Sequence, residues 1–201
     1  MRVFRMAFMI GLLALPAVPA AGAGGSDGWV GVMLGEHIPW NIAAPSFFPM
    51  LEFRAGYRVS RSFAMRIDLG GGYTVLQDPA RKTFEGASLF VGHASLGLLW
   101  TPALTDDLVL DLGGSFGLWM SSMWGDDLLG TVSGTESDYL EGLSVSYGAL
   151  AGLDWEVARD VAITFEVRAN LAQVEWGGKK YHTGGVSLLA GFLYRLASAG
   201  P

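Results

Sequence analysis

The stretch Leu51–Tyr73 reads LEFRAGYRVSRSFAMRIDLGGGY, and two kinds of residue alternate along it. In its first half the odd positions are apolar, while the even positions include Glu52, Arg54 and Arg58. A polar break at 60–62 follows, and the alternation then resumes. Successive side chains of a β-strand point to opposite faces, so a period of two indicates strands. The short break between the two runs predicts an antiparallel hairpin with one apolar face.

The composition indicates what the apolar face of this hairpin contacts. The chain has 201 residues, enough for one domain, and 51% of them are apolar against 16% charged. Its mean hydropathy is +0.36. After residue 25 no apolar run reaches the roughly 20 residues of a membrane helix. The absence of cysteine excludes disulfides and thiolate metal ligands. An oily chain without oily helices favours a β-barrel whose apolar face contacts lipid.

The first 23 residues are typical of a secretory signal peptide. They combine Arg2 and Arg5 with a short apolar run and a tail of small residues, which allows cleavage after Ala20 or Ala23. We therefore expect a signal peptide over 1–23 and a barrel domain over 24–201. The full chain already carries a net charge of −6, and losing two arginines makes it more acidic. A nucleic acid is therefore not an expected partner, because binding one requires basic patches.

The pattern of the hairpin repeats along the rest of the chain. Longer polar connections alternate with short ones, as they do in outer-membrane barrels, whose periplasmic turns are short. The sequence thus predicts an all-β fold, a transmembrane antiparallel up-and-down β-barrel of eight strands, with both termini on the periplasmic side. The strands are expected at 28–35, 51–59, 63–73, 88–101, 108–120, 142–156, 161–174 and 186–196, and the long loops at 36–49, 75–87, 121–140 and 175–183.

Aromatic residues gather at the ends of the predicted strands that meet the short turns. Amphipathic rings favour the headgroup level of a membrane, so a ring of them at one end predicts an interfacial girdle. The residues concerned are Tyr57, Phe63, Trp100, Trp155 and Tyr194.

The last predicted strand contains Gly191-Phe192-Leu193-Tyr194-Arg195-Leu196. With this ending and the strand pattern, the chain resembles the small eight-stranded outer-membrane barrels of Gram-negative bacteria, the OmpA/OmpX type of porin-like β-barrel domain. The resemblance implies that Gly191, Tyr194 and Leu196 belong to an assembly signal read by the barrel-insertion machinery. One departure is that Leu196 stands where the family's signal ends on an aromatic residue. The resemblance also implies an outer-membrane location, reached with the help of periplasmic chaperones.

The inward face of the predicted barrel carries almost balanced charge. Eight strands enclose a lumen just wide enough to be filled by side chains, and charges there are costly unless they are paired. We therefore expect a cross-linked polar plug rather than a selective pore, whose lining would be biased toward one sign. The predicted lumen charge network comprises Glu52, Arg54, Arg58, Arg66, Asp68, Asp111, Asp154, Glu156, Glu166, Arg168 and Arg195.

One pair of residues raises the question of catalysis. His93 and Ser95 are two apart on a strand and therefore share a face, as in the His-x-Ser arrangement of outer-membrane lipid A deacylases. Leu96 follows where that family's motif has Asn, and no acidic residue is placed to orient the histidine. The pair also points into the barrel. We expect an interior polar pair near Asp111 and no enzymatic activity.

The predicted loops show no ligand-binding motif. His37 and His182 are expected in loops, and the acidic residues of the longest loop lack the spacing of a calcium site, so we expect no cofactor and no metal. Cation-dependent contact with lipopolysaccharide is a hypothesis for that loop. The expected partners are outer-membrane lipid and lipopolysaccharide, and we expect a monomer whose loops carry a structural or surface role. A narrow pore and a secreted lipocalin-like binder remain alternatives. The loop acids are Asp126, Asp127, Glu136 and Asp138.

Overall fold

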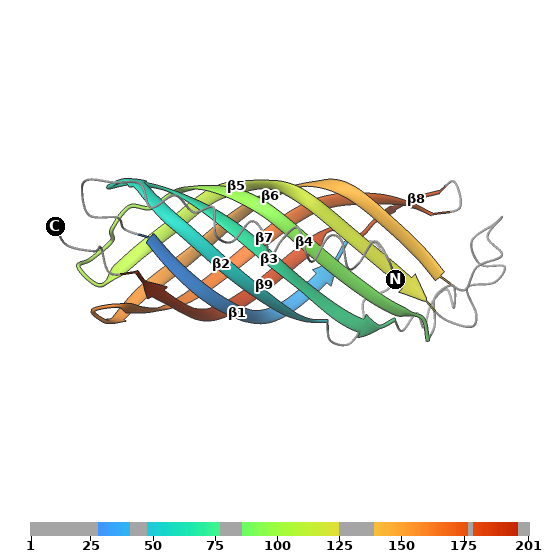
Figure 1. Cartoon of the computed structure of the whole chain (residues 1–201), viewed down its shortest axis with the longest axis horizontal. Helices are drawn as coiled ribbons and strands as arrows, with labels where there is room; N and C mark the ends of the chain where they lie inside the picture. Colours follow the sequence, from blue (N-terminus) through green and yellow to red (C-terminus); the bar gives the residue numbers. More distant parts are fainter. Residues whose placement is uncertain (1–27, 41–47, 77–85, 125–138, 177–178, 197–201) are drawn as a thin grey trace.

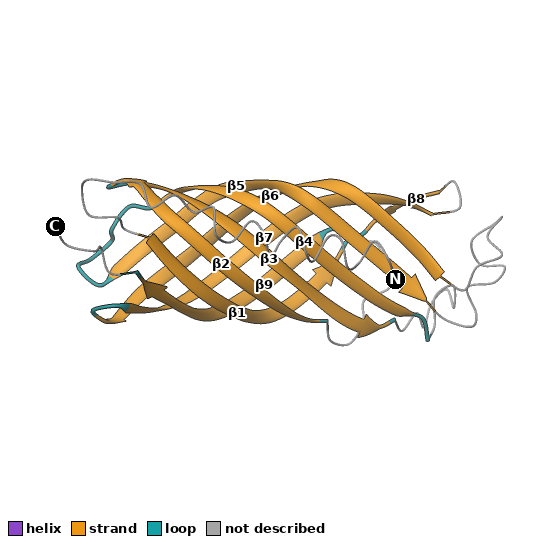
Figure 2. Ribbon diagram, viewed as in Figure 1, coloured by secondary structure: helices purple, strands orange, loops and turns teal. Residues whose placement is uncertain are grey.

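The computed structural model describes residues 28–40, 48–76, 86–124, 139–176 and 179–196. The proposed signal peptide lies outside these ranges. Figure 2 shows strands joined by short loops in the described part of the chain. No helix there is long and apolar enough to cross a membrane. The strands are β1 Gly28–Pro39, β2 Pro49–Ser60, β3 Phe63–Val75, β4 Ser88–Trp100, β5 Leu108–Trp124, β6 Tyr139–Ala158, β7 Val161–Trp176, β8 Lys179–His182 and β9 Gly185–Arg195.

Each of the longer strands pairs antiparallel with its neighbours in the chain, from β1 through β7. The sheet closes because β9 pairs with both β7 and β1. The result is a closed barrel with strongly tilted strands (Figure 1). At the short-turn end the Leu196 amide donates to the Gly28 carbonyl at 2.8 Å, so the two described ends of the chain meet there. The predicted up-and-down barrel is confirmed.

Nine labelled strands make an eight-stranded barrel because β8 and β9 form one interrupted strand. β8 pairs with the outer end of β7 and β9 with the rest of it. Between them the amides of Thr183 and Gly184 both donate to the Ala172 carbonyl, at 3.1 and 3.2 Å. Two residues facing one on the partner strand define a β-bulge, which bends the strand and locally interrupts the ladder.

The strands extend further toward the long-loop end than the sequence predicted. The predicted loops over 36–49, 121–140 and 175–183 were wrong at their edges, because β1, β5, β6, β7 and β8 occupy part of them. Pro39 misled the prediction, since proline usually ends a strand. Its missing amide faces β2, where the ladder has already ended at the Glu36–Pro49 pair, while β9 still pairs with Pro39. The proline therefore costs no ladder hydrogen bond.

The outward face of the barrel is apolar over most of its height. Leu98, Leu143 and Leu171 are each about two-thirds exposed, at 66%, 67% and 64%. The predicted girdle residues Phe63, Trp100, Trp155 and Tyr194 are also exposed at the short-turn end, and Tyr57 is partly exposed. Exposed apolar surface of this extent is costly in water. It suits a lipid environment.

The interior changes character along the barrel. Its middle is charged, whereas its outer end, beside the long loops, is filled by a buried apolar cluster that we call the outer cap. At the outer end of β7 the two faces of the strand exchange their polarity: Val174 and Trp176 are buried inside, while Glu175 is exposed. The outer cap contains Phe48, Leu76, Ala87, Leu89, Val91, Trp119, Met123, Leu140, Ala172, Val174 and Trp176, with Tyr181 packed against it.

Candidate functional site: a charge network across the lumen

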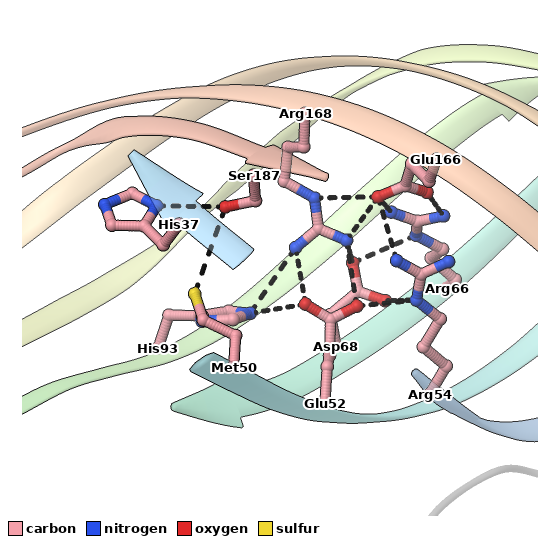
Figure 3. A network of polar contacts seen from close by, with 10 residues as sticks. All are labelled: His37, Met50, Glu52, Arg54, Arg66, Asp68, His93, Glu166, Arg168 and Ser187. Carbon is pink, nitrogen blue, oxygen red and sulfur yellow. Dashed lines mark hydrogen bonds and ion pairs between the residues drawn. The ribbon is translucent and has the colours of Figure 1, made fainter. Parts of the chain in front are cut away.

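Charged side chains from three strands meet in the middle of the lumen. They lie at alternate inward positions of β2, β3 and β7, and the tilt of the strands brings β7 across from β2 and β3 (Figure 3). His93 of β4 lies at one end of this group. We call these seven residues the central network: Glu52, Arg54, Arg66, Asp68, His93, Glu166 and Arg168.

Glu166 is the acceptor shared by all three arginines. Its Oε1 accepts hydrogen bonds from Arg54 Nη2 at 2.8 Å and from Arg168 Nη2 at 2.7 Å. Arg66 donates through both Nη atoms, to Oε2 at 2.5 Å and to Oε1 at 3.0 Å. Charge-assisted bonds of this kind are shorter and stronger than neutral ones. Glu166 thereby ties β2, β3 and β7 together.

Arg168 crosses the lumen to Glu52. Its Nη1 and Nη2 lie 2.8 and 3.0 Å from the two carboxylate oxygens, a bidentate contact between residues 116 positions apart. The same Nη2 lies 3.2 Å from Asp68 Oδ2. Arg168 is only 1% exposed. A planar guanidinium makes such a contact with fixed geometry, which an ammonium group would not.

The remaining contacts join neighbours on β2 and β3. Arg54 Nε donates to Glu52 at 2.5 Å and lies 3.5 Å from Asp68, and Arg66 Nε donates to Asp68 at 2.9 Å. Three arginines thus face three carboxylates, and the side chains of all six are at most 2% exposed. With the charges balanced and hydrogen-bonded, the desolvation cost of burying them is offset.

His93 is oriented by Glu52, its contact at 2.8 Å running from Nε2 to Oε2. Nε2 therefore carries the proton, since a carboxylate only accepts. The ring stacks on Trp119, with centroids 5.8 Å apart. Ser95 Oγ has no hydrogen-bond partner among the described residues. The structure therefore places His93 with Glu52 and not with Ser95; Asp111 is not its acidic neighbour.

The other predicted lumen residues lie nearer the short-turn end. Glu156 and Arg195 form a second ion pair, which is partly exposed. Arg58, Asp111 and Asp154 also face the lumen, but no ion pair within 4 Å joins any of them to another described residue. Of the eleven predicted residues, six thus belong to the central network, two form a separate pair, and three have no ion pair with another described residue.

His37 was placed in a loop by the sequence, and that prediction was wrong. It lies in β1, is 1% exposed, and its Nδ1 is 3.0 Å from Ser187 Oγ. Its Nε2 lies 3.4 Å from the Thr183 carbonyl oxygen, and its ring packs edge-on against Phe48. If the alternation of β1 is continued beyond Met33, residues 35 and 37 fall on the inward face, so the sequence pattern could have placed His37 in the lumen. His182, also expected in a loop, lies in β8 and is exposed.

The remaining predicted residues contribute no cluster of their own. Tyr194 and Leu196 are exposed, at 53% and 44%, and Gly191 lies opposite Met33 on β1. The acidic residues Asp126, Asp127, Glu136 and Asp138 lie outside the described residues. Among residues that are described, no group of three or more His, Asp or Glu side chains is placed to hold a metal.

A closed antiparallel barrel of eight strands, apolar outside and charged within, is the fold of the small outer-membrane β-barrels. Neisserial surface protein A has this fold and gives a TM-score of 0.56 at 15% identity, over 88% of this chain and 100% of its own. The Yersinia pestis attachment invasion locus protein Ail gives 0.51 at 11% identity, over 87% and 100%. A major outer membrane protein of Thermus thermophilus gives 0.53 at 11%, over 85% and 99%. No family model and no curated protein matches the sequence.

Proposed function

We propose that the protein is an integral outer-membrane barrel with a structural or surface-interaction role carried by its long connections. The observation that carries this proposal is the distribution of polarity: leucines two-thirds exposed outside, and six charged side chains at most 2% exposed inside. A lipocalin-like binder would have the opposite arrangement, with a polar exterior and an apolar ligand cavity. In the membrane the short turns face the periplasm and the long connections face outward.

The lumen is closed to ions in this proposal. Ions passing along the axis would have to cross the central network, whose arginines are each held by at least two carboxylates. They would then meet the outer cap, whose members Trp119 and Met123 are 1% and 0% exposed. A charge passing through such an apolar layer would lose its hydration without replacement. These two layers of described residues support a closed lumen over the narrow-pore alternative.

No catalytic role is part of the proposal. The geometry needed for a lipid A deacylase is a histidine in hydrogen-bond reach of a serine that faces the lipid. Here His93 is bonded to Glu52 inside the lumen, and Ser95 is 8% exposed. The proposed partners are outer-membrane lipid and lipopolysaccharide around the barrel, and chaperones and the insertion machinery during assembly. The barrel is proposed to act as a monomer.

Surface labelling of intact Gram-negative cells tests the orientation and location together. An epitope inserted within 125–138 should be labelled on intact cells, and the protein should fractionate with the outer membrane. A matched epitope at the β6–β7 turn, between Arg159 and Asp160, should be labelled only after the outer membrane is permeabilised. Labelling of the turn epitope on intact cells, or recovery of the protein in the soluble fraction, would contradict the proposal.

Planar-bilayer recording tests the closed lumen. Purified, folded protein should give no stable conductance on the nanosiemens scale. An eight-stranded barrel that conducts steadily would show that the central network and the outer cap open together, and the narrow-pore alternative would replace the closed lumen.

A further inference from the structure

Two carboxylates in the periplasmic half of the lumen form no ion pair within 4 Å with another described residue. Asp111 of β5 lies opposite Gly152 of β6, and Asp154 is the next inward residue of β6, so the two aspartates are diagonal neighbours on one wall. Asp111 is 8% exposed, and the negative charge of Asp154 repels it. Because like charges in a confined interior repel strongly, such a pair needs a positive partner.

The arginines do not supply that partner. Arg54 and Arg66 are held by Glu52, Asp68 and Glu166 in the central network. Arg195, nearer the short-turn end, is paired with Glu156. Arg58 faces the same part of the lumen but lies more than 4 Å from either aspartate. Its single positive charge balances only one of the two carboxylates, so one negative charge remains.

The oxygens around this gap point to a ligand. Asp154 lies directly opposite Thr164 of β7, and its Oδ1 is buried without a hydrogen-bond partner. Asp111 makes no hydrogen bond or ion pair with another described residue. Gly152, directly opposite Asp111, has no side chain, and a Cβ there would lie 3.7 Å from the Cβ of Asp111; the buried Val109 lies directly opposite Asp154.

We propose that Asp111 and Asp154, with the hydroxyl of Thr164, bind a partly hydrated divalent cation such as Mg²⁺ or Ca²⁺. Both cations prefer carboxylate and neutral oxygen ligands, and Mg²⁺ in particular is commonly held by one or two carboxylates while it keeps several waters. Two protein carboxylates are fewer than a closed metal cage requires, so the remaining ligands are waters. These waters reach the site from the short-turn end, where Glu156 and Arg58 are partly exposed.

Thermal unfolding in micelles free of lipopolysaccharide tests this site. Wild-type protein treated with EDTA should gain about 2–4 °C in unfolding midpoint on titration with Mg²⁺ or Ca²⁺, and the gain should saturate. The double variant Asp111→Asn/Asp154→Asn should show no gain. Its midpoint in EDTA should exceed that of the wild type, because the repulsion is gone. Asp107→Asn, which removes an exposed carboxylate at the same end of the barrel, should respond like the wild type.

The two cations are distinguished by their separate titrations, and a gain with either supports the site. If the wild type shows no saturable gain, or if the double variant keeps it, the site is wrong. If the unfolding midpoint rises only on acidification and not with either cation, the two carboxylates share a proton, and the cation assignment is overturned. If the double variant does not fold, the single variant Asp111→Asn is tested in its place. It should show no gain in unfolding midpoint, and it should lose the tryptophan-sensitised Tb³⁺ luminescence of the wild type.

Discussion

Arg168 on β7 and Glu52 on β2 meet across the lumen with both guanidinium Nη atoms on both carboxylate oxygens. They belong to strands that are not neighbours in the barrel, so this contact joins opposite walls. Together with the contacts of Glu166 to Arg54 and Arg66, it links side chains across the lumen, in addition to the backbone ladders around the circumference.

Breaking this pair should destabilise the barrel strongly. Glu52→Gln leaves three arginines against two carboxylates inside the lumen, and an uncompensated buried charge costs about 3–5 kcal/mol. Chemical unfolding in lipid bilayers measures the change. As a control, Glu156→Gln removes one partner of the partly exposed pair with Arg195 and should cost at most about 1 kcal/mol. Equal effects of the two substitutions would show that the central network contributes no more than a surface pair.

The outer cap should keep the lumen closed even when the network is disturbed. Glu166→Gln removes the carboxylate that three arginines share, yet Trp119 and Met123 still fill the lumen above it. We expect no stable conductance from this variant in planar bilayers. We expect Trp119→Ala to cost about 3–5 kcal/mol in unfolding free energy. Steady conductance of Glu166→Gln alone would show that the charges, and not the apolar layer, form the seal.

The lipid-facing surface should not tolerate charge at mid-height. Leu96 is 55% exposed and lies on β4, four residues from the girdle residue Trp100. Leu96→Arg should cost about 2–4 kcal/mol in a bilayer, because arginine near the midplane is poorly solvated. Val59→Arg, beside the short turn after β2, is the matched control and should cost about 1 kcal/mol or less. A larger cost at Val59 than at Leu96 would contradict the assigned membrane position.

Nδ1 of His37 depends on Ser187 for its hydrogen bond inside the lumen. Ser187→Ala leaves Nδ1 of a 1% exposed imidazole unsatisfied, which should cost about 1–3 kcal/mol. Ser60→Ala, at an exposed position on the short turn, should change the unfolding free energy by less than about 0.5 kcal/mol. If both variants unfold alike, the His37–Ser187 contact does not contribute to stability.

The barrel and the two faces of its strands followed from the sequence because a period of two is a local signal. Glu52, Arg54, Arg66 and Asp68 were assigned to the lumen from alternation alone, and each is buried there. The partners were not predictable, because Arg168 reaches Glu52 only through the tilt and register of the closed sheet.

Two features misled the prediction at the long-loop end. Pro39 and the glycine-rich segment before Lys179 are turn signals, and they hid the outer ends of the strands. The same region reverses the polarity rule, with Val174 inside and Glu175 outside. Reading the inner face as polar throughout therefore missed the outer cap and, with it, the position of His37.

The reversed polarity of the outer cap places a second core outside the bilayer. Glu141 on β6 and Glu175 on β7 are exposed at the outer ends of their strands, and charged side chains on a lipid-facing surface are destabilising, so these ends lie beyond the hydrocarbon in the proposed orientation. Their neighbours Leu140, Val174 and Trp176 are buried in the outer cap. Above the membrane, this end of the barrel is therefore built like a small water-soluble protein, with its apolar side chains inside and its charges outside.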